Sequence, residues 1–103
     1  MAFRKDDRDK PRYHLLPRPA LEEVIRAFMH GAGRYGAFNW RECTDPVRYL
    51  DAAARHVMRA LDDPAVVIHD EESGLPVLAH AAASVLIALQ LQMEGDGHGG
   101  EAG

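Results

Sequence analysis

The sequence predicts an all-α fold, with three helices in each protomer and a helical dimer or tetramer as the assembly. Two segments, residues 19–34 and 46–61, place apolar side chains at helical spacing, so each forms one apolar stripe. A third segment, residues 74–92, is apolar almost all round, and such a helix needs cover on every side. Three helices in a chain of 103 residues do not provide that cover, so we expect copies of the chain to pack together.

The first helix is expected to begin near Pro19, which suits the first turn of a helix, and to run to about Arg34. Gly31 and Gly33 weaken its last turns, and Gly36 is a natural stop. One side of this helix carries its apolar stripe: Leu21, Val24, Ile25, Phe28 and Ala32.

The second helix is expected to begin with Thr44 or Asp45 as its cap and Pro46 in its first turn. The sequence Asp-Asp-Pro at 62–64 ends it, and residues 65–72 form a loop or a short irregular segment. Its apolar stripe consists of Val47, Leu50, Ala54, Val57, Met58 and Leu61.

The third helix is expected to have Ser73 as its cap and Pro76 in its first turn. Around the helices, residues 13–93 form the predicted domain. Residues 1–12 are mostly charged, and we expect them to be poorly ordered. Residues 94–103 are rich in glycine, which predicts a disordered tail.

Composition restricts the classes of function. A net charge of −4 and a pI near 5.8 argue against a general nucleic-acid binder, which usually shows a basic face. Cys43 is the only cysteine, so no intrachain disulfide forms and a reducing compartment is the default. The N-terminus lacks the apolar core of a signal peptide, and the apolar run over 75–91 falls short of the about 20 residues of a membrane span. We therefore expect a cytoplasmic protein without a membrane or nucleic-acid partner.

Four carboxylates are candidate metal ligands. Glu22 and Glu23 open the first helix, where they fit either solvated charges that complement the helix dipole or ligands of a hard divalent cation. Asp70 and Glu72 precede the third helix, and the same two interpretations apply to them: capping with dipole complement, or metal ligation.

Two histidines on helices are candidates for acid–base chemistry. His56 lies at the edge of the apolar stripe of the second helix, and its neighbour Arg55 fits either a solvated side chain or a phosphate contact. His80 lies inside the apolar third helix, with Ser84 one turn later. A buried imidazole is costly unless it is hydrogen-bonded, so His80 is either a satisfied core residue or a functional group.

The stretch GAGRYGAFNW, residues 31–40, is too rich in glycine for a helix interior and too aromatic for a flexible linker. It gathers Arg34, Tyr35, Asn39 and Trp40 at the end of the first helix, which suggests one half of a nucleotide site. The two aromatic residues also fit a purely structural role as anchors over the helix end. No zinc-ligand spacing and no Walker A sequence are present.

Four segments carry a resemblance to a known family: KPRYHLLP, LEEVIRAFMHGAGRYGAFNW, YLDAAARHVMRAL and DEESGLPVLAHAAASVLIAL. In this order and spacing, over about residues 10–92, they resemble the small phage-associated dATP/dGTP diphosphohydrolase domain. That domain is a relative of the all-α MazG-type nucleotide pyrophosphohydrolases. The resemblance implies metal-dependent cleavage of a deoxypurine triphosphate, dGTP or dATP, to monophosphate and pyrophosphate. It also implies a MazG-like dimer or tetramer and a divalent metal, Mg²⁺ or Mn²⁺, as the cofactor.

The residues that match the family divide into three groups. The expected metal ligands are Glu23, Asp70 and Glu72, with Glu22 in reserve. His56 or His80 orients or deprotonates the attacking water. The expected substrate contacts are Arg34 and Arg55 to phosphates, Tyr35 or Trp40 stacked on the base and Asn39 at the polar edge of the base.

The chain departs from the family pattern at four positions. His14 stands where Asp is usual, Val77 where His is common and Ser84 where Asn is common. Arg26 takes the place of the third glutamate of the MazG-type EExxE helix. Two alternatives to an enzyme therefore stay open: a non-catalytic nucleotide-binding or regulatory protein on the same fold, and a helical oligomerisation module.

Overall fold

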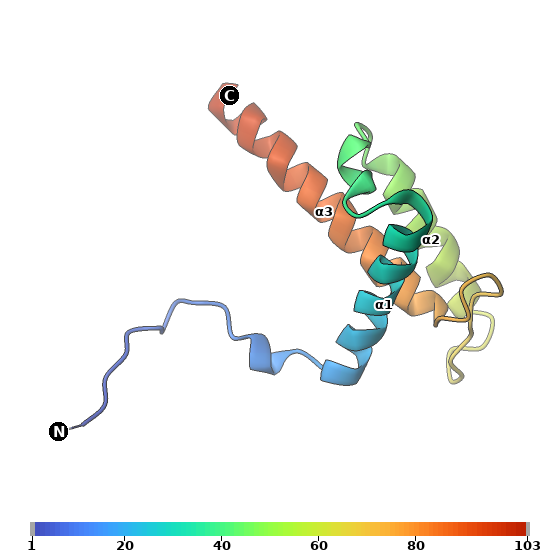
Figure 1. Cartoon of the computed structure of the whole chain (residues 1–103), viewed down its shortest axis with the longest axis horizontal. Helices are drawn as coiled ribbons and strands as arrows, with labels where there is room; N and C mark the ends of the chain where they lie inside the picture. Colours follow the sequence, from blue (N-terminus) through green and yellow to red (C-terminus); the bar gives the residue numbers. More distant parts are fainter. Residues whose placement is uncertain (1, 103) are drawn as a thin grey trace.

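The computed structural model describes the backbone of residues 2–102 and the side chains of residues 2–96. Three α-helices dominate it (Figure 1): α1 (Arg18–Tyr35), α2 (Val47–Ala60) and α3 (Val77–Ala102). Two short 3-10 helices, η1 (Tyr13–Leu15) and η2 (Asn39–Glu42), precede α1 and α2. The described residues contain no β-strand beyond one isolated bridge between His69 and Pro76, which confirms the all-α prediction.

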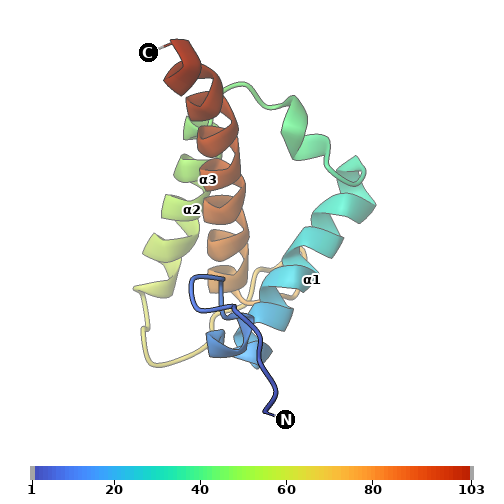
Figure 2. The same ribbon diagram turned by 90° about the vertical axis from the view of Figure 1, so that its left-hand side faces the viewer.

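Helix α3 is the centre of the arrangement. Helix α2 lies antiparallel beside it, whereas α1 meets α3 near the start of α3 and leans away towards its own C-terminal end (Figure 2). The loop with η2 bridges the end of α1 and the start of α2. The axes of α1 and α3 therefore diverge from the start of α3 (Figure 2).

Small side chains form most of the core. Ala27 of α1 packs against Ala79 and Ala83 of α3, and Val24, Phe28 and Leu75 surround this contact. Among the described residues, the buried apolar side chains are Ala27, Ala53, Val77, Ala79, Ala81, Ala83, Ile87 and Ala88. Alanine lets the helix backbones approach closely, and dense packing of this kind leaves little room for larger side chains.

Prolines and caps set the helix starts. The Asp45 Oδ1 accepts the Val47 N–H at 3.0 Å, so Asp45 supplies the capping bond of α2. The expectation that Ser73 caps the third helix is wrong, because α3 begins at Val77. Pro76 has no N–H and disfavours helical geometry in the residue before it, so the helix starts only after Pro76.

Much apolar surface stays uncovered on the protomer. The stripe predicted on α2 faces away from α3, and Met58 within it is 64% exposed. On α3, one face is about half exposed: Leu78, Val85, Leu86, Leu89 and Met93. This agrees with the expectation that one copy cannot cover α3.

Helix α3 is also apolar and long enough over Val77–Asp96 to cross a membrane, judged by length and composition alone. The apolar run over residues 75–91 alone is too short for a membrane span, and the continuous helix adds the missing residues. Core and interface helices of soluble proteins have the same properties, so the absence of a membrane partner stays a prediction.

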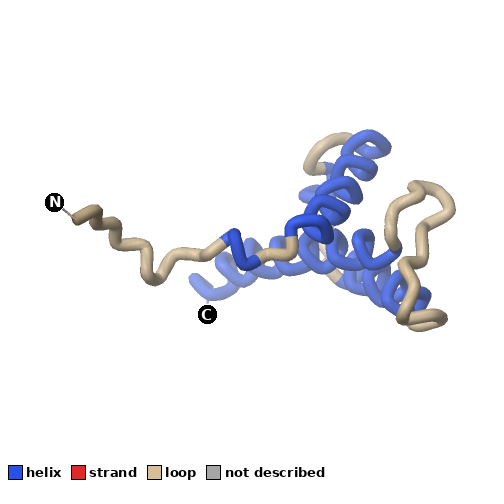
Figure 3. Tube along the Cα trace, turned by 90° about the horizontal axis from the view of Figure 1, so that it is seen from below, coloured by secondary structure: helices blue, strands red, loops and turns tan. Residues whose placement is uncertain are grey.

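The two ends of the chain differ from each other. Residues 2–12 form no helix or strand and extend away from the helices with exposed side chains (Figure 3). At the other end, α3 continues through residues 94–102, the stretch for which the glycine content predicts a disordered tail. Whether that stretch is disordered in solution stays a prediction, which amide hydrogen exchange would measure.

Candidate functional site

Three imidazoles, one from each long helix, meet beside the core. The His56 ring of α2 stacks on the His80 ring of α3 with 5.3 Å between centroids. His30 of α1 meets the His80 ring edge-on, with 6.0 Å between centroids. His56 and His80 were candidates from the sequence, whereas His30 was not. Nothing local marks His30, because only the packing of α1 on α3 places it beside His80.

The surroundings favour the neutral form of two of these rings. Burial lowers the pKa of His80 below its ordinary value, His56 and His30 lower it further, and Asp70 opposes them. Burial also lowers the pKa of His56, where Arg55 and Arg59 act in the same direction and Asp70 in the opposite one. Both rings are therefore neutral at pH 7 and offer a lone pair that accepts a proton.

Asp70 organises the loop that leads into α3. Its Oδ2 accepts the backbone N–H of Ser73 at 2.9 Å and that of Glu72 at 3.1 Å. The backbone closes the same loop, because the Gly74 N–H donates to the Asp70 carbonyl and the Asp70 N–H donates to the Leu75 carbonyl, both at 2.8 Å. The Ser73 amide is the main cause that lowers the pKa of Asp70, so this carboxylate is ionised at neutral pH.

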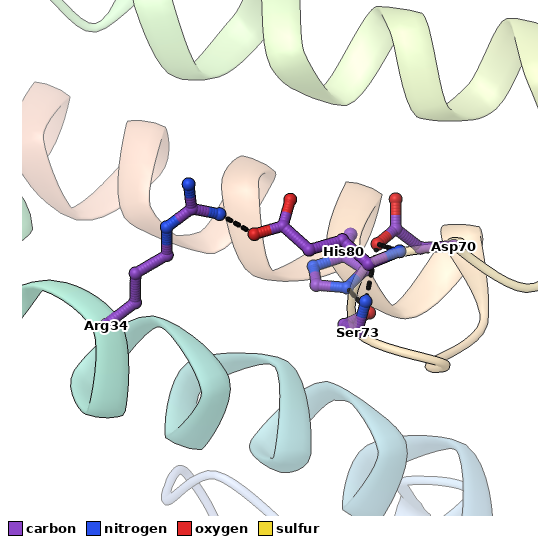
Figure 4. Close-up of polar contacts among 5 residues, drawn as sticks. Arg34, Asp70, Ser73 and His80 are labelled. Atoms are coloured by element: carbon purple, nitrogen blue, oxygen red, sulfur yellow. Dashed lines mark hydrogen bonds and ion pairs between the residues drawn. The ribbon is translucent and has the colours of Figure 1, made fainter.

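This loop brings Ser73 back over α3. The Ser73 Oγ lies 2.6 Å from His80 Nε2 (Figure 4) and accepts the N–H of Leu75 at 3.1 Å. The half-buried imidazole thus has a hydrogen-bond partner.

An ion pair spans the space between α1 and the loop. Arg34, in the last turn of α1, pairs with Glu72, and Figure 4 shows it reaching towards the loop that holds Ser73 and Asp70. Both partners are about half exposed, so solvent screens the pair and it adds little stability. A guanidinium in this place is available to a phosphate group that displaces the carboxylate.

A cavity of about 370 Å³ lies between α1, the segment that follows it and α3. Eight of the ten residues of the stretch 31–40 line it, which explains why that stretch combines glycine with aromatic residues. A Cβ on Gly31 or Gly36 would meet nothing within 4 Å, so the glycines border open space. The polar groups on its wall include Tyr35, Asn39, Trp40, Tyr49, His80 and Ser84. An apolar pocket of this size with a few polar groups is typical of a small-molecule site.

The predicted substrate residues are therefore split. Tyr35, Asn39 and Trp40 line the cavity, and Arg34 lies beside it without lining it. Arg55 is exposed on α2. Its charge helps to lower the pKa of His56.

The structure does not bring the four predicted metal ligands together. Glu23 is 2.6 Å from the guanidinium of Arg26, which also lies 3.9 Å from Glu22. Asp70 is bound within its own loop and Glu72 is paired with Arg34. Among the described side chains, no three His, Cys, Asp or Glu residues form a group suited to a metal ion. As arranged here these carboxylates do not fit a divalent cation, and their role as ligands stays a prediction.

Gly74, in the loop before α3, has a φ of +75°, which lies in the left-handed region that favours glycine. Changing Gly74 to alanine should lower the free energy of unfolding by about 1–2 kcal/mol, because a Cβ is strained there even in open space. Urea unfolding measures this. The matched control is Gly33→Ala inside α1, which also faces open space and should stabilise the protein by about 0.5–1 kcal/mol. Equal effects at both positions would contradict the prediction.

Comparison with known proteins agrees with the resemblance seen in the sequence. A family model described as "dATP/dGTP diphosphohydrolase, N-terminal" matches residues 2–99. A protein named dATP/dGTP diphosphohydrolase from Salmonella phage PMBT28 is 34% identical over 87 residues, which cover 84% of this chain. The chain spans only 29% of that relative. No solved structure matches it.

Proposed function

The chain belongs to the dATP/dGTP diphosphohydrolase N-terminal family, and from that premise we propose that it hydrolyses dATP or dGTP to the monophosphate and pyrophosphate. One observation carries the proposal: neutral His80 forms part of the wall of an apolar cavity, with Arg34 nearby. A base for water, a pocket for a nucleobase and a cation for phosphates thus lie side by side. The name of the phage relative supports dATP and dGTP as the substrates.

Each side chain then has one task. The purine enters the cavity, where Tyr35 or Trp40 stacks on it and Asn39 meets its polar edge. Arg34 exchanges Glu72 for a phosphate. His80 accepts a proton from a water molecule whose oxygen bonds to phosphorus, while the bond between the α and β phosphoryl groups breaks and pyrophosphate leaves.

The test is direct. Purified protein is incubated with each of the four common deoxynucleoside triphosphates and with ATP and GTP, in Mg²⁺, in Mn²⁺ and in EDTA. We expect equal amounts of monophosphate and pyrophosphate from dATP or dGTP. The EDTA arm measures the metal requirement, which is a prediction from the family resemblance and has no assembled ligand set behind it. Release of inorganic phosphate instead, or no product from any nucleotide, would refute the proposal.

A non-catalytic nucleotide-binding protein is the second candidate, because the four carboxylates are not gathered. Calorimetry with dGTP separates the two functions. Binding without turnover under every metal condition would establish the binding protein.

We also propose that the protein forms a homo-oligomer around α3. Leu78, Ala82, Val85 and Leu89 follow one another at steps of four, three and four residues, the spacing of a seam between packed helices. The three larger side chains of this seam are about half exposed in the protomer. A second copy that packs its own seam there would remove this surface from water.

The histidines predict a pH dependence. Since both folded-state pKa values lie below the ordinary 6.5, the acid limb of kcat/KM should fall below pH 6.5. Stability should respond in the same window. Between the lowered pKa and 6.5 the unfolded chain binds more protons, so the free energy of unfolding decreases as pH falls through this range and levels off only well above 6.5. Rate profiles and urea unfolding between pH 5 and 8 measure both. A rate limb centred above 6.5 would contradict the assignment.

A further inference from the structure

The segment before α1 has apolar side chains that its own protomer leaves in water. Residues 2–17, the N-terminal arm, extend away from the three long helices (Figure 1) and include the short helix η1 (Tyr13–Leu15). We propose that the arm of one copy docks in an apolar groove at the start of α3 in a second copy. This contact is separate from the nucleotide reaction and adds to the contact proposed along the α3 seam.

Three large apolar side chains lie close together on the arm. Tyr13 is 78% exposed, Leu15 is 72% exposed and Leu16 is about half exposed. The Leu16 N–H donates to the Tyr13 carbonyl at 3.1 Å, and residues three apart in a 3-10 helix lie on one side. Since removing apolar surface from water is favourable, a groove that covers these side chains would bind the arm.

An apolar groove lies where the start of α1, the loop after α2 and the start of α3 come together. Its volume is about 510 Å³, and among the described side chains that line it only Glu23 is ionisable. The loop contributes Val66 and Val67, which are both more than half exposed, and α3 contributes Leu78. Such a wall suits leucine and tyrosine side chains, whereas a charged ligand would lose its hydration there without gaining a partner.

The charge around the groove complements the charge of the arm. Residues 62–72, which form one wall, contain five carboxylates and no lysine or arginine, and Asp62 and Asp63 among them are exposed. The arm has five basic residues against three carboxylates, and Lys10 and Arg12 stand directly before its apolar side chains. Opposite charges at the rim of the groove therefore orient the arm as its apolar side chains enter.

The backbone between the arm and α1 favours a second copy over the arm's own groove. Leu16 and Pro17 are both extended, with ψ of 139° and 105°. Pro17 has a fixed φ and keeps the residue before it out of the helical region, so the chain does not reverse at this point. The groove of the same copy begins at Pro19 and Ala20, and the arm points away from the helices (Figure 3). Exchange of an identical segment between protomers is a low-cost route to association.

The groove also continues the α3 seam. Leu78 and Ala82 line the groove and are the first two residues of the seam. A docked arm and a packed seam therefore remove adjoining parts of one apolar surface from water.

Disulfide trapping between two chains tests the contact. In a Cys43→Ser background, one chain carries Leu15→Cys and the other carries Val67→Cys, and the two proteins are mixed and oxidised. We expect a disulfide between the two chains. The matched control uses Met58→Cys in place of Val67→Cys, because Met58 is 64% exposed and Val67 63%, and Met58 lies on α2 outside the groove. Equal yields with both partners overturn the proposal.

A chain that carries both Leu15→Cys and Val67→Cys separates exchange from an arm that folds onto its own copy. Exchange gives disulfide-linked dimers or longer species on a non-reducing gel. Single chains closed by an internal disulfide, or chains that stay unlinked, overturn the proposal.

Sedimentation velocity provides the second measurement. Leu15→Glu combined with Leu16→Glu should weaken self-association by roughly 10- to 100-fold, because two large apolar side chains would no longer leave water on docking. Phe3→Glu, the same change near the start of the arm, should leave the association within about twofold. Unchanged association of the double variant overturns the proposal. Neither measurement uses nucleotide turnover, so both decide the contact even if the proposed function fails.

Discussion

Replacing His80 with glutamine is expected to lower kcat for dATP or dGTP by roughly 100- to 10,000-fold, the usual contribution of a positioned acid–base group. Glutamine keeps the length and polarity of the side chain but cannot accept the proton from water. KM should change little, because most of the cavity wall is apolar and unaltered. Initial rates of pyrophosphate release at pH 7.5, with and without the substitution, measure the effect.

The control for this experiment is His69→Gln. His69 is exposed in the loop before α3 and lies outside the three-histidine cluster, so the same chemical change there should leave kcat within about twofold. Circular dichroism of both variants checks that they retain the helices. Wild-type turnover in His80→Gln would remove the base from the mechanism and transfer that role to His56.

Replacing Leu89 with lysine is expected to weaken self-association by at least 100-fold. Leu89 is 48% exposed in the protomer and lies within the α3 seam. A lysine there would bury an ammonium group without a partner in a two-fold contact, and this costs several kcal/mol. Because the position is half exposed in one copy, the protomer itself should stay folded. Sedimentation velocity across a range of concentrations measures the association.

Gln90→Lys is the matched control, since it introduces the same charge one residue away, on a side of α3 that is already polar. It should associate as the wild type does. Dissociation by both variants would indicate a general effect of charge, and dissociation by neither would place the interface elsewhere on the molecule.

The sequence predicts the helices well because their limits are local. Pro19, Asp45 and Gly36 act through their own backbone geometry or hydrogen bonds, and α1 and α2 begin and end within a few residues of the predicted limits. Ser73 shows where local reasoning fails. Serine often caps a helix, but Pro76 makes the helix start later. The Ser73 hydroxyl instead forms a hydrogen bond with His80, seven residues further along the chain.

The candidate site was predictable in part. The mixture of glycine and aromatic residues at 31–40 suits neither a helix nor a linker, and it predicted a binding surface. Most of these residues line the cavity. His30 could not be found in the same way, since its role depends on the angle at which α1 crosses α3. Which side of α2 packs on α3 depends equally on the tertiary packing. Periodicity shows that Val57 and Met58 belong to one apolar stripe, but it does not show whether that stripe meets α3.

The alanine core has a consequence for how the protein tolerates mutation. In most domains the sensitive positions are large apolar residues, whose truncation leaves cavities. Here six buried positions among the described side chains already hold alanine: Ala27, Ala53, Ala79, Ala81, Ala83 and Ala88. Nearly every substitution at these positions enlarges the side chain, and overpacking costs about 1–3 kcal/mol each time. Many of the large apolar residues, by contrast, lie on the protomer surface, where we propose that they contact other copies of the chain. A saturation scan of this domain would therefore separate folding from assembly by side-chain size, with the smallest residues reporting on the first and the largest on the second.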